Sequence, residues 1–136
     1  MFNNIVIALK EGLPHDRLLD LAASVADDGA KIHLTTLVRV GTDEDEPKRL
    51  AAVGEYLEQR AGQLRERGFD VTWEHGLVVV AAAADVLQVV TSRNADLVVI
   101  GLAKRTRVGK ALMGSDAQRI MMGAPCPVLV TQLYRD

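Results

Sequence analysis

The sequence alternates short apolar runs, rich in Val, Ile and Leu, with segments whose apolar residues recur at helical spacing. The runs predicted to form strands are Asn4–Leu9, Lys31–Val40, Phe69–His75, Leu97–Ile100 and Cys126–Leu133. The segments predicted to form helices are Pro14–Asp27, Ala81–Ser92, Ser115–Met122 and a segment that follows an acidic loop, has its apolar stripe at Leu50–Leu64 and ends at Gly68. Strands that alternate with helices form parallel sheets through right-handed crossovers. We therefore predict an open α/β sheet of five parallel strands with helices on both faces, as a single domain over residues 1–136.

Composition narrows the classes of protein to which the chain can belong. The apolar stretch Leu77–Ala84 is too short to span a bilayer, so no membrane helix is expected. The formal net charge of −2 argues against broad nucleic-acid binding. A single cysteine, Cys126, cannot form an internal disulfide, and the N-terminus lacks a basic leader. We expect a cytoplasmic protein.

The connection after the fourth predicted strand is the main candidate for a binding site. It carries Gly101, four basic residues between Lys104 and Lys110, and a Gly114-Ser115 pair before helical periodicity begins. Glycines let a backbone approach a ligand closely, and a helix start offers unpaired N–H groups to an anion. In open α/β sheets, ligands lie beyond the carboxyl ends of the strands. A phosphate site and a plain solvated loop both fit this composition.

The start of the last helix allows a second, purely structural interpretation. Ser115 and Gln118 have the spacing of a capping box, in which the hydroxyl accepts from the Gln118 N–H while the Gln118 side chain reaches back. The loop matches neither the Walker A pattern nor G-x-G-x-x-G. Helix capping as the sole role of Ser115 is therefore an alternative to phosphate binding.

Two motifs resemble the universal stress protein family. That family carries G-x2-G-x9-G-[ST] after its fourth strand and an APCPVLV-like final strand. Here Gly101, Lys104 at the second glycine position, and Gly114-Ser115 follow the first motif, and residues Ala124–Val130 read APCPVLV. The order of strands and helices extends the resemblance over nearly the whole chain.

The resemblance implies a sheet in the order 3-2-1-4-5, a homodimer, and in some members a site for ATP or related adenine nucleotides. Carried onto this sequence, the candidate nucleotide- or phosphate-binding residues are Gly101, Lys104, Gly114, Ser115, Asp116 and Lys10. The fifth strand should be an edge, so we expect the two copies of Pro127–Leu133 to meet in the dimer.

Two residues depart from the pattern of nucleotide-binding relatives, and a third weakens anion binding at the helix start. Lys10 stands where nucleotide-binding relatives end the first strand with Asp, and Lys104 places a long side chain where a glycine backbone approaches phosphate. Asp116 would repel a phosphate at the helix start. The Lys104 ammonium group can itself contact a phosphate. We expect ATP or AMP to bind weakly or not at all, with another anion as the alternative ligand.

The titratable residues suggest no catalytic set. His15, His33 and His75 lie in three different segments without a Cys or His partner at ligand spacing, so no metal site is predicted. Three function classes remain: a non-enzymatic stress protein that senses a nucleotide or anion, a nucleotide-free dimeric interaction module, and a slow phosphohydrolase. The enzyme ranks last because no general base lies near Gly114-Ser115.

Overall fold

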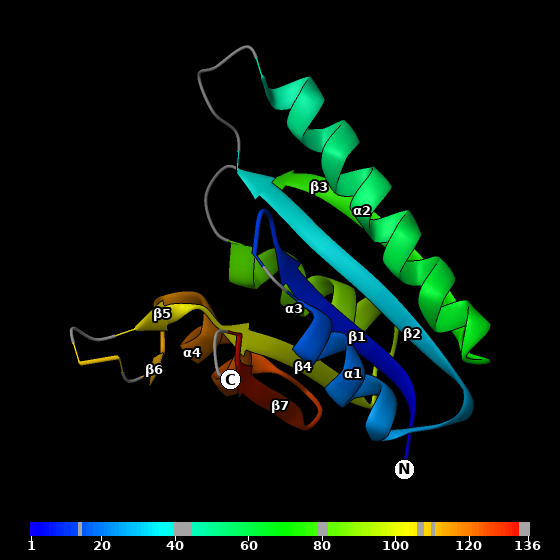
Figure 1. The fold of residues 1–136 in the computed structure, drawn as a ribbon. Helices are drawn as coiled ribbons and strands as arrows, with labels where there is room; N and C mark the ends of the chain where they lie inside the picture. Colours follow the sequence, from blue (N-terminus) through cyan, green and yellow to red (C-terminus); the bar gives the residue numbers. More distant parts are fainter. Residues whose placement is uncertain (14, 40–44, 79–81, 106–107, 110, 134–136) are drawn as a thin grey trace.

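Five parallel strands form the central sheet of the computed structural model, which describes residues 1–13, 15–39, 45–78, 82–105, 108–109 and 111–133. The strands are β1 (Phe2–Lys10), β2 (Ala26–Arg39), β3 (Asp70–Val78), β4 (Leu97–Leu102) and β7 (Val128–Gln132). Their order is β3-β2-β1-β4-β7, with β1 in the centre (Figure 1). Because β7 is the fifth strand of this sheet, the predicted order 3-2-1-4-5 is confirmed.

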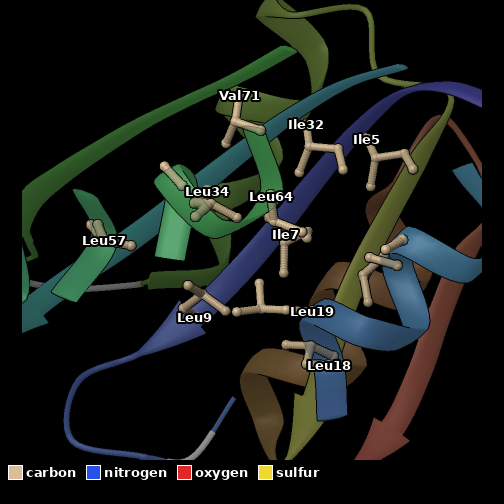
Figure 2. Close-up of a cluster of buried hydrophobic side chains, with 14 of the residues drawn as sticks. Ile5, Ile7, Leu9, Leu18, Leu19, Ile32, Leu34, Leu57, Leu64 and Val71 are labelled. Atoms are coloured by element: carbon tan, nitrogen blue, oxygen red, sulfur yellow. The ribbon is translucent and has the colours of Figure 1, made fainter. Parts of the chain in front are cut away.

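Helices cover both faces of the sheet, as predicted. They are α1 (Asp16–Ser24), α2 (Glu46–Glu66), α3 (Ala82–Ser92) and α4 (Ser115–Gly123). Side chains of a strand alternate between faces, so Ile5 and Ile7 of β1 pack with α1 and α2 whereas Val6 packs with α3 and α4. Figure 2 shows the first of these clusters, in which Leu18 and Leu57 reach toward β1 and β2.

The first helix is shorter than the sequence predicts. The expected helix Pro14–Asp27 ends at Ser24, and Asp27 lies in β2, which begins at Ala26. At the end of the helix the Val25 N–H donates to the Ala22 carbonyl at 3.2 Å. The chain then reverses direction, and β2 pairs with β1. The predicted Asp-Asp-Gly stop therefore falls inside the strand.

A short antiparallel ribbon lies where the sequence predicts only a loop. Strands β5 (Lys104–Arg105) and β6 (Ala111–Leu112) pair with each other and form a sheet separate from the central one. In Figure 1 the ribbon projects beside β4 and α4, away from α2. Two-residue strands carry no detectable period in a sequence, so periodicity could not have predicted them.

Among the described residues, no helix is both long and apolar enough to cross a membrane. The helices instead present apolar stripes to the sheet. In α2 this stripe is Val53, Leu57, Ala61 and Leu64, the same spacing from which the helix was predicted.

Candidate functional site

A groove lies where the strand order reverses, between the carboxyl ends of the neighbouring strands β1 and β4. We call it the switch-point groove. Its walls come from β1, β2, α3, β4 and α4 and comprise Ala8, Leu9, Lys10, Thr35, Leu37, Ala82, Ala83, Val86, Ile100, Gly101, Asp116, Ala117 and Ile120. Most of these side chains are apolar. The groove therefore has the position of a ligand site in an open α/β sheet.

The groove brings together three of the six residues predicted from the sequence: Lys10, Gly101 and Asp116. Lys10 is the last residue of β1 and follows Ala8 on the strand face that packs against α3 and α4. Asp116 stands in the first turn of α4, on the opposite wall. A cation and a carboxylate thus share a site that was predicted to receive an anion.

Gly101 has a packing role that the sequence did not reveal. A Cβ built on this residue would lie 2.4 Å from Leu133 Cδ2 and 2.7 Å from Leu133 Cγ. Strand alternation puts this position on the opposite face from Ile100, which belongs to the cluster under α3 and α4. Leu133 belongs to the cluster on the α1 face. The missing side chain of Gly101 therefore makes room for Leu133, on the face away from the groove.

The start of α4 contradicts the predicted capping box. Gly114, not Ser115, is the N-cap residue, and the helix start has no side-chain cap hydrogen bond. The Gln118 N–H donates to the Gly114 carbonyl at 3.1 Å, and the Gln118 side chain donates to the Met113 carbonyl at 3.5 Å. The extended backbone of Gly114 supplies the first acceptor, so Ser115 already has a helical position. Gly114 and Ser115 precede Asp116 but are not among the described residues that line the groove.

The remaining predicted site residue is Lys104. Its backbone forms part of β5, where it is opposite Leu112 of β6. The Lys104 side chain, and all of Arg107 and Lys110, lie outside the described residues.

The switch-point groove is small. Its volume is about 70 Å³. An outer hollow of about 340 Å³ overlaps it and is lined by Lys10, Glu11, Leu13, Leu37, Arg49, Ala82 and Asp116. Sites for small organic ligands commonly enclose roughly 300–1,000 Å³. A nucleotide would therefore depend on the outer hollow, where charged residues form much of the wall.

Comparison with known proteins decides the family. Residues 1–132 match the family described as the Universal stress protein family. The chain belongs to that family. It is 32% identical over 142 residues to the Thermus aquaticus protein named "Universal stress protein in QAH/OAS sulfhydrylase 3'region", covering 97% of this chain and 100% of that protein.

Solved structures of universal stress proteins share the fold. The protein from Archaeoglobus fulgidus has a TM-score of 0.73 at 21% identity, over 96% of this chain and 98% of its own. A structure of a universal stress protein from A. fulgidus in complex with dAMP has a TM-score of 0.65 at 19% identity, over 94% and 96% of the two chains. The family resemblance predicted from the two motifs is thus confirmed.

This universal stress protein has a second, larger cavity beside the end of β1, which sequence reasoning missed and which shares Leu9 and Lys10 with the switch-point groove. We call it the α2 pocket. It has a volume of about 590 Å³ and is lined by Leu9, Lys10, Glu11, Gly12, Leu13, His15, Thr36, Arg49, Ala52, Val53 and Tyr56. These residues come from β1, the β1–α1 connection, β2 and α2. Residues 9–13 are consecutive, but the fold alone brings them beside β2 and α2, so no local motif could have indicated the pocket.

His15 holds the β1–α1 connection in this universal stress protein. The side chain is 2% exposed, and the Lys10 N–H donates to its Nε2 atom at 2.9 Å. Because Nε2 accepts, Nδ1 carries the proton, and it lies 3.4 Å from the Tyr56 hydroxyl oxygen. Burial is the main cause that lowers the pKa of His15 to about 4. His15 is therefore a neutral structural group at pH 7.

His33 is also engaged in structural bonds. It is buried in β2, where Nδ1 lies 2.7 Å from Thr72 Oγ1 and Nε2 lies 2.9 Å from Glu74 Oε1. Burial lowers the pKa of His33 as well. Within the described part of the chain, no three His, Cys, Asp or Glu residues are grouped so that they could hold a metal ion.

Proposed function

We propose that this universal stress protein is a non-enzymatic stress-response protein whose switch-point groove binds an adenine nucleotide or another anion weakly. The single observation that carries the proposal is the presence of Lys10 and Asp116 in the walls of one groove at the strand-order reversal. The dAMP complex of the Archaeoglobus fulgidus relative supports an adenine nucleotide as the class of ligand to test.

The phosphate end of the proposed site is the start of α4. Backbone N–H groups at a helix start attract an anion, and we propose Gly114, Ser115 and the Lys104 side chain as phosphate contacts. The Asp116 carboxylate complements the same positive helix end and repels a phosphate there. Two opposing effects at one helix start support weak anion binding rather than a tight triphosphate site.

The adenosine end of the proposed site is also poorly suited to tight binding. Lys10 presents an ammonium group where family members that bind nucleotides carry a carboxylate, so it cannot accept a hydrogen bond from adenosine. The groove behind it encloses only about 70 Å³. The base would gain little burial, and the phosphate would contribute most of the affinity.

Titration calorimetry with ATP, AMP and pyrophosphate tests this proposal. Because the adenine contributes little, we expect ATP and pyrophosphate to bind with dissociation constants within about tenfold of each other, a difference below about 1.4 kcal/mol. Preference for ATP over pyrophosphate by about a hundredfold or more would contradict the proposal and indicate a specific adenosine site.

A nucleotide-free dimeric interaction module is the second candidate, and the edge position of β7 favours it. Within the described residues, β7 pairs with β4 and has no second neighbour in the sheet. The Val98 N–H donates to the Pro127 carbonyl, and the Leu133 N–H donates to the Leu102 carbonyl. Backbone groups alternate along a strand, so odd-numbered residues of β7 face β4 and Val130 turns its N–H toward the open edge. We propose that this edge pairs with a second copy.

The change Val130→Pro should convert a β7-paired dimer to monomer. Proline removes the outward N–H and leaves the bonds to β4 in place, because those bonds come from the odd-numbered residues. The control is Val130→Ala, which loses much of the same packing against the α3–α4 cluster but keeps the N–H group. Analytical ultracentrifugation should find Val130→Ala dimeric and Val130→Pro monomeric. A dimer that survives in both variants would place the interface elsewhere.

A further inference from the structure

We propose that the α2 pocket binds an organic monoanion with an apolar body, whose carboxylate lies beside Lys10. The pocket has a volume of about 590 Å³, within the range of roughly 300–1,000 Å³ that is usual for small-molecule sites. It overlaps the switch-point groove and the outer hollow, because Lys10 lines all three and Leu9, Glu11, Leu13 and Arg49 each line two of them. This site goes beyond the proposed nucleotide site, since the body of the ligand would lie against α2.

The described lining of the α2 pocket carries an excess of positive charge. It contains the cations Lys10 and Arg49 and one carboxylate, that of Glu11. His15 is neutral at pH 7 because burial lowers its pKa to about 4. In the outer hollow Asp116 joins Glu11 against the same two cations, and in the switch-point groove Asp116 opposes Lys10. Of the three hollows, the α2 pocket is therefore the one whose described charges favour an anion.

Lys10 supplies the positive charge that a ligand can use. Arg49 is engaged by Glu11, because its Nε and Nη2 atoms lie 2.9 Å and 2.8 Å from Glu11 Oε1. Lys10 is exposed at the end of β1, and within the described residues its ammonium group has no ion pair. Its backbone is held in place, since the Lys10 N–H donates to His15 Nε2 at 2.9 Å. A ligand carboxylate can thus pair with Lys10 without separating Arg49 from Glu11.

The floor of the pocket is apolar. Leu9 is 5% exposed and Val53 is 8% exposed, so both belong to the core beneath the pocket, and Leu13 packs against the same cluster. An aromatic or alicyclic body would bury apolar surface against these three side chains, which is the main source of affinity in such sites. A small anion without such a body would gain only the contact with Lys10.

The charges of the lining favour a carboxylate over a phosphate as the anionic group. A phosphate monoester carries a charge of about −1.5 to −2 at pH 7. Within the described lining, its second charge would have to compete with Glu11 for Arg49 or remain unpaired against apolar walls, which is costly. A monocarboxylate carries one negative charge, and Lys10 can pair with it.

Three probes separate the two parts of the ligand at pH 7 and low ionic strength: biphenyl-4-carboxylate, biphenyl-4-carboxamide and acetate. The carboxamide removes the charge and keeps the shape, whereas acetate keeps the charge and lacks the apolar body. By titration calorimetry we expect biphenyl-4-carboxylate to bind about tenfold more tightly than the carboxamide and at least about a hundredfold more tightly than acetate. A carboxamide or an acetate that binds as tightly as biphenyl-4-carboxylate would overturn the proposal.

The change Lys10→Gln tests the contact with the carboxylate. It should weaken biphenyl-4-carboxylate binding by about tenfold and leave carboxamide binding unchanged within about twofold, because it removes the charge and leaves the apolar floor intact. The control is Lys31→Gln, which should change neither affinity. Lys31 is also an exposed lysine on a strand, but it lies opposite Asn4 near the start of β1, whereas Lys10 ends that strand. Unchanged carboxylate binding in Lys10→Gln, or equal weakening of both probes, would overturn the assignment to Lys10.

Matched tryptophan substitutions on α2 distinguish the α2 pocket from the two hollows that overlap it. Ala52 is exposed and lines the α2 pocket but is not among the described lining residues of the groove or the outer hollow. Ala51 is exposed on the same helix and lines none of the three in their described parts. Ala52→Trp should weaken biphenyl-4-carboxylate binding by about tenfold or more, and Ala51→Trp should leave it unchanged. Equal binding by the two variants would overturn the assignment, whatever the affinity for pyrophosphate, which tests the nucleotide site.

Discussion

Lowering the pH from 7 to 4.5 should destabilise the unmodified protein by about 2 kcal/mol more than it destabilises a His15→Gln variant. The pKa of His15 falls from 6.5 to about 4 in the folded state, chiefly through burial. Between these two values the unfolded chain binds the proton and the folded chain does not. The stabilising contribution of neutral His15 is therefore complete above about pH 6.5 and is lost as the pH falls toward 4.

Urea unfolding at several pH values measures this difference. Glutamine cannot titrate here, yet its side-chain oxygen can still accept the hydrogen bond from the Lys10 N–H. His33 titrates in the same direction because burial lowers its pKa too, so both proteins should lose some stability in acid. The difference between the two curves isolates His15. Parallel curves from pH 7 to 4.5 would show that His15 is not held neutral by the fold.

Gly101→Ala should lower the free energy of unfolding by about 1–3 kcal/mol, the usual cost of forcing an extra carbon into a packed core. The new Cβ would lie 2.4 Å from Leu133 Cδ2 and 2.7 Å from its Cγ, so the whole Leu133 side chain must move. Gly76 offers a matched control in β3, because a Cβ there would meet Leu37 Cδ2 at an ordinary 3.6 Å.

A double-mutant cycle assigns the effect to the contact with Leu133. Leu133→Ala alone should cost about 2–5 kcal/mol, because it leaves a cavity in the core. Adding Gly101→Ala to that variant should then cost little, since the clashing atoms are gone. Additive losses in the double variant would mean that Gly101 is required for another reason, such as close approach of a ligand to its backbone.

The arrangement of the sheet could be predicted from the sequence because its signals are local and strong. β1 and β4 are apolar on both faces, as strands covered by helices must be, and the α2 stripe repeats over several turns. The end of α1 was mispredicted because Asp27 and Gly29 are also compatible with a turn. Pairing of β2 beside β1 overrode that local preference.

The candidate site was only partly predictable, for a different physical reason. The loop motif pointed to Gly101 and to the helix start at Asp116, the end of the first strand pointed to Lys10, and the fold brings these three residues to one groove. A glycine fits at position 101 because a side chain there would clash with Leu133, which is distant in the sequence. The α2 pocket is formed by residues of β1, β2 and α2. Contacts between distant segments leave no spacing pattern for a single sequence to reveal.

The most direct test of the central claim is the affinity for ATP of the unmodified protein and of Asp116→Asn. Removing the carboxylate at the start of α4 should tighten ATP binding by about fivefold, the effect of about 1 kcal/mol of charge repulsion near a protein surface. Asp85→Asn is the matched control, because Asp85 stands in the first turn of α3 and is not among the described lining residues of the groove. Titration calorimetry should show weak binding by the unmodified protein and the control, and tighter binding by Asp116→Asn. Tight ATP binding by the unmodified protein, or equal affinity in all three proteins, would contradict the account.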